Sequence, residues 1–204
     1  ERCARVLSGE VLNPFMPYSS VQAYAPDGTW EELSLGGGEV KEIAIDPTNR
    51  QVMYVAVGLD LVYKSVDGGE TWSFSGKGMD LPSLEIMCIA IDPLNPSVLY
   101  AGGSLNAAAI LYKSTDAGKT WTRSDTTIKD VKGPVSYIIA DPSAPGLAYA
   151  LTFFSQFYRS TNGGADWVLS MSGFSWPLES HGLTLNKSSL QASSLHICDM
   201  YAHY

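Results

Sequence analysis

The sequence is poor in basic residues, and those it has are not clustered. Its 204 residues include 13 lysines and arginines against 21 aspartates and glutamates, which gives a formal net charge of −8. An acidic surface repels the phosphate backbone, so this composition argues against nucleic acid as a partner. Long apolar runs are also missing: the longest, LAYALTFF at 147–154, is too short for a membrane-spanning helix.

A signal peptide and a cysteine framework are missing as well. The first ten residues, ERCARVLSGE, are charged and lack an apolar core, which fits a cytosolic protein, a mature secreted protein or a trimmed chain. Of the three cysteines, Cys88 lies in the apolar run IMCIAI and is expected to be a small buried side chain. Cys3 and Cys198 could form a disulfide if the ends of the chain meet.

Motifs of common enzymes and metal sites do not occur. The three histidines have no metal-ligand spacing, and there is no P-loop, dinucleotide fingerprint or G-x-S-x-G elbow. The sequence therefore predicts no metal and no cofactor.

What the sequence does contain is a repeated phrase. VYKSVDGGETW at 62–72 returns as LYKSTDAGKTW at 111–121 and, more loosely, as FYRSTNGGADW at 157–167. The closing tryptophans, Trp72, Trp121 and Trp167, are separated by 49 and 46 residues, and Trp30 ends a degraded copy 42 residues before Trp72. A period in the forties is typical of one four-stranded β-propeller blade.

Each period has the same internal order. An apolar run ends in Asp-Pro (EIAIDP, CIAIDP, YIIADP), and two further strand-like runs lead into the phrase. The runs are short, rich in β-branched and aromatic residues, and bounded by Gly, Pro, Asn or Asp. The sequence therefore predicts an all-β fold, a β-propeller of four-stranded antiparallel blades, with full blades at 40–81, 86–129 and 135–176.

The two ends of the sequence carry weaker copies. Residues 1–35 predict a partial or degenerate blade, in which 21–35 supply the last two strands, and 182–204 predict the first strands of another. The expectation is a single domain over 1–204 with four to five blades, closed as a small ring or open as an arc. An open arc exposes sheet edges, so a homodimer or the remainder of a larger propeller would complete it.

The phrase itself has the composition of a hairpin turn. Its aspartate can accept backbone hydrogen bonds, its glycines can adopt positive φ, its serine can tie the strand to the turn, and its tryptophan can fold back and become buried. A catalytic interpretation would require three similar active sites, and a calcium site would require more carboxylates. We therefore expect a structural device at Ser65, Asp67, Gly69, Trp72, Ser114, Asp116, Gly118, Trp121, Ser160, Asn162, Gly164 and Trp167.

The pattern S-x-D-x-G-x-T-W resembles the Asp-box, or BNR, repeat. Such repeats occur in sialidases, xyloglucanase-type glycoside hydrolases, sortilin-like receptors and photosystem assembly factors of the Ycf48 kind. The preceding AIDP unit is similar to that of bacterial extracellular proteins with tandem Asp-boxes, which implies an extracellular or periplasmic location. The resemblance covers about residues 21–204 and implies the propeller fold, but these families share no single activity.

The loops at the end of the propeller opposite the phrase, among them the predicted loop 102–110, vary most, and a ligand is expected there. Acidic residues in these loops could form a glycosidase pair or be ordinary surface groups. Aromatic residues could stack on sugar rings or pack between blades. The candidate binding residues are Asp60, Asp80, Glu85, Asp130, Phe153, Phe154, Trp176, Glu179 and His181.

Two functions remain open at this point. One is a non-catalytic interaction module that binds a protein or a glycan, favoured because no catalytic constellation is present. The other is an extracellular glycoside hydrolase of the xyloglucanase type, or a fragment of one, favoured by the repeat style and the acidic loops. A sialidase is disfavoured because no arginine precedes Ile-Pro, and Arg159 takes the place of Lys64 and Lys113 in its repeat.

Overall fold

The protein is described from a computed structural model, which covers residues 4–6, 21–24, 30–33, 39–59, 61–124, 133–154 and 156–171. Every regular element in these ranges is a β-strand, so the all-β prediction is confirmed. No helix in the described part of the chain has the length and hydropathy needed to cross a membrane.

The strands form four antiparallel sheets in chain order. The first sheet has three strands, β1 (Ala4–Val6), β2 (Val21–Tyr24) and β3 (Trp30–Leu33). The second has four: β4 (Glu42–Ile45), β5 (Met53–Ala56), β6 (Val62–Ser65) and β7 (Ser73–Phe74). The third has four: β8 (Leu84–Ile91), β9 (Leu99–Leu105), β10 (Ala108–Ser114) and β11 (Thr122–Arg123). The fourth has four: β12 (Val135–Ala140), β13 (Ala148–Thr152), β14 (Phe157–Ser160) and β15 (Val168–Met171).

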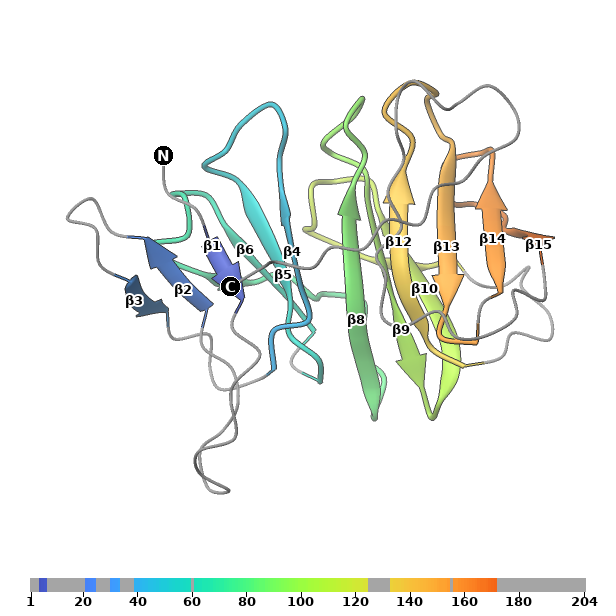
Figure 1. The fold of residues 1–204 in the computed structure, drawn as a ribbon, viewed down its shortest axis with the longest axis horizontal. Helices are drawn as coiled ribbons and strands as arrows, with labels where there is room; N and C mark the ends of the chain where they lie inside the picture. Colours follow the sequence, from blue (N-terminus) through green and yellow to red (C-terminus); the bar gives the residue numbers. More distant parts are fainter. Residues whose placement is uncertain are drawn as a thin grey trace, which may run out of the picture.

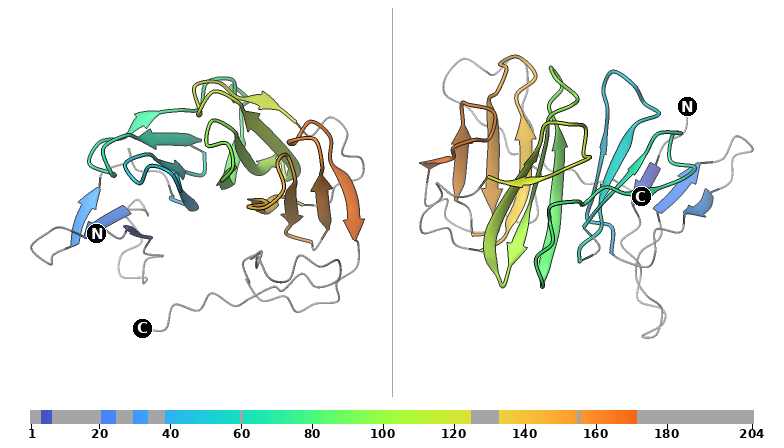
Figure 2. Two further views of the ribbon diagram at one scale, coloured as in Figure 1. Left: turned by 90° about the horizontal axis from the view of Figure 1, so that it is seen from above. Right: turned by 180° about the vertical axis from the view of Figure 1, so that it is seen from behind.

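The sheets stand side by side in an arc (Figures 1 and 2). Seen from above in Figure 2, the first strands β4, β8 and β12 line the inner rim, and the fourth strands β7, β11 and β15 lie at the outside. Neighbouring inner strands pack on one another, β8 against both β4 and β12. This is the radial arrangement expected of propeller blades.

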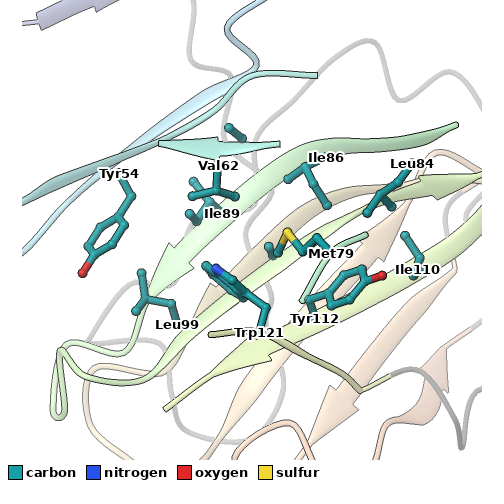
Figure 3. Packing of buried hydrophobic residues seen from close by; sticks show 12 residues of the cluster. Tyr54, Val62, Met79, Leu84, Ile86, Ile89, Leu99, Ile110, Tyr112 and Trp121 are labelled. Atoms are coloured by element: carbon teal, nitrogen blue, oxygen red, sulfur yellow. The ribbon is translucent and has the colours of Figure 1, made fainter. Parts of the chain in front are cut away.

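The core lies between neighbouring sheets. Tyr54 and Val62 of the second sheet pack against Leu99, Trp121 and other residues of the third, as Figure 3 shows. Ala56 belongs to the same cluster. An equivalent cluster joins the third and fourth sheets. Because side chains alternate across a strand, one face of the third sheet packs on the second sheet and the other on the fourth. Each blade is therefore stabilised by its neighbours.

The longest hairpin differs from the sequence-based expectation. The segment 102–110 was predicted to be a loop, yet β9 and β10 extend through it and are joined by a two-residue turn. Asn106 and Ala107 in this turn both have positive φ, of 51° and 65°, as a type I′ turn requires. Gly103 is typical of a loop, yet it lies within strand β9. The position requires glycine because a Cβ there would stand 1.9 Å from the carbonyl oxygen of Glu85 on β8.

Candidate functional site

The two ends of the strands carry different connections. In the second, third and fourth sheets, the turns after the first and third strands lie at one end, which we call the turn end. They meet there: Gly68 N donates to Gln51 O and Ala117 N to Ser97 O. In these sheets the turns after the second strand, together with the connection between β7 and β8, lie at the opposite end, which we call the variable end. This follows from antiparallel pairing within each sheet.

The repeated phrase forms the same turn each time. In the second sheet, Ser65 Oγ donates to Asp67 Oδ1 (2.7 Å) and accepts from Gly69 N (2.8 Å). Hydrogen bonds from the side chain and backbone of Thr71, followed by that from Ser65, lower the pKa of Asp67 to about 2. The equivalent bonds recur at Asp116, where burial would raise the pKa but the hydrogen bonds lower it to about 2.

The third copy makes the same turn, but the carboxylate and the side-chain donor exchange positions. Asn162 stands in the aspartate position and Asp166 in the threonine position. Asn162 Oδ1 accepts from Asp166 N (2.9 Å), while Asn162 Nδ2 donates to Asp166 Oδ2 (2.7 Å). In the other two copies the threonine hydroxyl donates to the carboxylate instead. The pair has one carboxylate and one donor in every copy.

Substituting Asn162→Asp should therefore destabilise the protein at pH 7 by roughly 1–2 kcal/mol, because two carboxylates would face each other with no donor between them. Urea unfolding at pH 7 measures the change. The double variant Asn162→Asp/Asp166→Thr recreates the pair seen at Asp67 and Thr71 and should recover the loss. Equal destabilisation in the single and double variants would contradict the exchange.

The turns also join neighbouring sheets. The hydroxyl of Tyr54 (2.9 Å) and Nζ of Lys64 (3.0 Å) both donate to the carbonyl of Ala117 in the next sheet's turn. In return, Trp121 Nε1 donates to the carbonyl of Ser75 (2.6 Å), and Ser75 Oγ donates to the carbonyl of Gly118. The turn is thus a joint between blades as well as a hairpin connection.

This corrects the role expected of the tryptophans. Trp121 and Trp167 are buried, 3% and 2% exposed, but they lie between sheets and do not merely cover their own hairpins. Trp72 was also expected to be buried, and it is only half-buried. Its Nε1 donates to the carbonyl of Gly69 in its own turn, where the other two indoles reach Ser75 or Ser124 of the preceding sheet.

At the variable end, apolar side chains are exposed. Phe153 and Phe154, in the turn between β13 and β14, are 54% and 57% exposed and pack edge to face with ring centroids 5.6 Å apart. Phe153 N donates to the carbonyl of Pro134, which fixes the turn against the incoming connection. Leu59 and Leu81 are also exposed at this end. The contacting pair Phe153 and Phe154 is called the variable-end patch below.

The acidic candidate residues are not brought into contact with one another in the described part of the chain. Glu85 lies 3.4 Å from Lys41 Nζ, which also pairs with Glu39. Burial would lower the pKa of Lys41, but the two glutamates raise it above its ordinary value. Asp80 is exposed on the connection between β7 and β8. Five further candidates lie outside the described residues: Asp60, Asp130, Trp176, Glu179 and His181. The structure therefore places Asp80, Glu85, Phe153 and Phe154 at the variable end and brings only the two phenylalanines into contact.

One titratable group of the inner rim is not among the residues predicted from the sequence. Glu42 on β4 accepts a hydrogen bond from Ile89 N on β8 (2.8 Å) and is partly buried. Burial raises the pKa of Glu42 to about 7, although the bond from Ile89 opposes this. Burial also raises the pKa values of Cys88 and Tyr137, and the charge of Glu42 adds to both shifts. Glu42, Cys88 and Tyr137 occupy the same position in successive repeats, which is the signal that could have revealed the cluster.

Within the described residues, no group of three or more His, Cys, Asp or Glu side chains could hold a metal ion. The expectation of no metal and no cofactor stays a prediction for the chain as a whole.

Comparison with known proteins gives matches at the level of structure. No protein-family model and no curated protein sequence matches this chain. YCF48 bound to D1 peptide has a TM-score of 0.54 at 19% identity, covering 65% of this chain and 40% of YCF48. An ancestral GH74 enzyme has a TM-score of 0.58 at 19% identity, covering 72% of this chain and 22% of the enzyme. Sqt1 from Chaetomium thermophilum, bound to the N-terminus of ribosomal protein L10, has a TM-score of 0.51 at 14% identity, covering 72% and 42%.

The chain has the fold of part of a β-propeller. It spans less than half the length of each of these proteins. At these identities the likeness establishes the propeller fold, and it covers proteins that bind peptides as well as glycoside hydrolases.

Proposed function

We propose that this propeller is a non-catalytic interaction module that binds a peptide segment of a partner protein at the variable-end patch. The observation that carries the proposal is the exposed Phe153–Phe154 pair, held in a short turn by the bond from Phe153 N to Pro134 O. Large aromatic side chains that remain solvent-exposed on a rigid scaffold favour a binding surface. The peptides bound by YCF48 and Sqt1 support a protein ligand over a glycan.

We also propose that the repeated turns are Asp-box repeats. The Ser–Asp and Asp–Thr hydrogen bonds, present twice and mirrored a third time, support this assignment. The extracellular or periplasmic location that the resemblance implies remains a prediction.

Selection of peptides from a displayed random library on the immobilised full chain tests the binding proposal. A selected peptide should bind at least about tenfold more weakly to the double variant Phe153→Ser/Phe154→Ser, a loss of roughly 1.4 kcal/mol or more. The matched control is Phe74→Ser, since Phe74 is 56% exposed on β7 at the outside of the arc. Equal binding to the wild type and the double variant, or no selected peptide at all, would refute the proposal.

A glycoside hydrolase is the second candidate, and Glu42 is the observation that favours it. A carboxyl group whose pKa is raised to about 7 has the property of a general acid, and Glu42 lies on an inner strand. Release of reducing sugar from xyloglucan by the wild type, and its loss in Glu42→Gln, would support this candidate. A glycosidase also requires a second carboxyl group opposite the acid. Among the described residues, only burial and the hydrogen bond from Ile89 shift the pKa of Glu42, and no neighbouring carboxylate does.

A further inference from the structure

The joint between blades recurs with one exception. Tyr54 on β5 pairs across strands with Lys64 on β6, and both reach the turn of the following sheet. In the third sheet, Tyr100 pairs with Lys113, and the two lie 3.8 Å (OH) and 3.3 Å (Nζ) from the point where a Cβ on Gly163 would be. Ser75 and Ser124, each three residues after the tryptophan of its own repeat, accept the indole hydrogen bonds that complete the joints. We call each Tyr, Lys and Ser set an anchor trio.

The first sheet lacks this trio. The residue after each repeat tryptophan pairs with the lysine position, as Ser73 does with Lys64. In the first sheet the residue after Trp30 is Glu31, which pairs with Ala23, and Ala23 in turn pairs with Ala4. The backbone register therefore puts Ala23 at the lysine position, Ala4 at the tyrosine position and Leu33 at the serine position. None of these three offers a phenol, an ammonium or a hydroxyl group.

The turn that this trio would contact is correspondingly open. A cavity of about 800 Å³ lies on the second sheet at the turn end, lined among others by Ile45, Met53, Gly68 and Glu70. Ile45 is 45% exposed, whereas its counterpart Ile91 packs against the cluster that contains Tyr54. The half-burial of Trp72, described above, agrees with a joint that the described residues leave unfilled. We call this cavity the first socket; its volume is in the range of small-ligand sites.

The filled joint between the second and third sheets shows what such a socket accepts, whereas the buried Tyr100 hydroxyl in the next joint makes no hydrogen bond within the described residues. In the second joint the ring of Tyr54 lies over Gly118, where a Cβ would stand 2.8 Å from the ring, and its hydroxyl bonds to the carbonyl of Ala117. Nζ of Lys64 bonds to the same carbonyl and lies 5.1 Å from the centre of the Tyr54 ring. A phenol and an ammonium side by side on one carbonyl are therefore the occupant. Gly68 supplies the equivalent carbonyl position in the first socket.

The charge of the first socket suits a cation better than that of the second. Lys119 follows the turn in the second socket, and after burial its charge is the next cause that lowers the pKa of Lys64. Glu70 takes the place of Lys119 in the first socket, so a carboxylate stands there in place of an ammonium group. Asp67 lines the first socket as Asp116, which raises the pKa of Lys64, does the second, and Arg50 is the cation among the described lining residues. Opposite charge near a desolvated ammonium group favours its binding, where like charge opposes it.

We propose that the first socket is a ligand site for a phenol beside a primary ammonium group, as presented by a tyrosine and a lysine on neighbouring strands of a partner protein or by a free arylethylamine. The hydroxyl and ammonium groups would donate to the carbonyl of Gly68, and the ring would pack on Met53 and Ile45. This site lies at the turn end, and it is separate from the proposed function at the variable-end patch.

Three probes distinguish the sources of this chemistry. The first is a disulfide-closed hairpin peptide with Tyr opposite Lys in a cross-strand pair. The second is the same peptide with Phe opposite norleucine, and the third is tyramine. Calorimetric titration of the full chain should give binding of the Tyr–Lys hairpin at least about tenfold tighter than of the Phe–norleucine hairpin, equal to roughly 1.4 kcal/mol. Tyramine binding as tight as that of the hairpin would identify the small amine as sufficient, whereas hairpin binding alone would identify a protein segment.

Charge reversal provides the matched variants. Glu70→Lys gives the first socket the charge of the second and should weaken the Tyr–Lys hairpin about tenfold or more, and Lys119→Glu, the reverse change at a filled joint, should leave binding unchanged. Binding equal in the wild type and Glu70→Lys, or no preference between the two hairpins, would overturn the proposal. The variable-end variants Phe153→Ser/Phe154→Ser should bind this hairpin normally, so the two proposed sites can fail separately.

Discussion

Replacing Trp121 by alanine should lower the free energy of unfolding by about 3–5 kcal/mol, the range for truncating a buried aromatic side chain. The indole is 3% exposed between two sheets, and its Nε1 donates to the carbonyl of Ser75. The substitution leaves a cavity in the joint and removes the donor from that carbonyl, so both effects act in the same direction. Chemical denaturation followed by circular dichroism measures the change.

Trp72→Ala is the matched control, because Trp72 has the same place in its repeat but is only half-buried and bonds within its own turn. Its loss should be clearly smaller than that of Trp121→Ala. If the two variants are equally destabilised, the tryptophans stabilise their own hairpins and contribute nothing further to the joint between blades.

Glu42→Gln should change how stability depends on pH. The pKa of Glu42 is about 7 in the folded protein and near 4.5 when unfolded, so folding favours the neutral form. The stability linked to this group is fully present below about pH 4.5 and is lost as the pH rises through about 7. The wild type should therefore lose roughly 2–3 kcal/mol between pH 5 and pH 8 relative to the variant, whose amide stays neutral and can still accept the bond from Ile89.

Urea unfolding of both proteins at several pH values, compared as a difference, isolates Glu42 from histidines that titrate in the same range. Glu39→Gln is the control, because Glu39 is an exposed carboxylate paired with Lys41. That substitution should give a small difference that hardly varies from pH 5 to pH 8. If the difference for Glu42→Gln is equally flat, the carboxyl of Glu42 is charged and solvated in the folded protein.

The fold could be predicted because its main determinants are local. A tryptophan, a tight turn and an Asp-Pro recur in every period, and each has an intrinsic conformational preference that needs no distant partner. The β9–β10 hairpin was underestimated because Gly103 and Asn106 are typical of loops. Only the closeness of the Glu85 carbonyl shows why glycine lies within a strand.

The joints could not be seen in the sequence for a different reason. Tyr54 and Lys64 are ten positions apart, and only the cross-strand register brings them to the same carbonyl. The burial of Trp72 was predicted wrongly for the same cause, since it depends on a neighbouring sheet and not on the turn. Of the candidate binding residues, the two phenylalanines form a contact, and the role of the whole set remains a prediction.

In both described joints the tyrosine and the lysine come from one sheet and the turn that they approach comes from the next, so the arc has a direction. A tandem duplication of one period would copy both halves together, and the new blade would fit beside its parent without any further substitution. Removing a single strand from a period would damage the contacts on both sides of that blade. Gain of a whole repeat is therefore an accessible evolutionary step for this architecture, while loss of part of a repeat is not. A blade with alanine at the tyrosine and lysine positions, as in the first sheet, is a place where the series of blades can be interrupted.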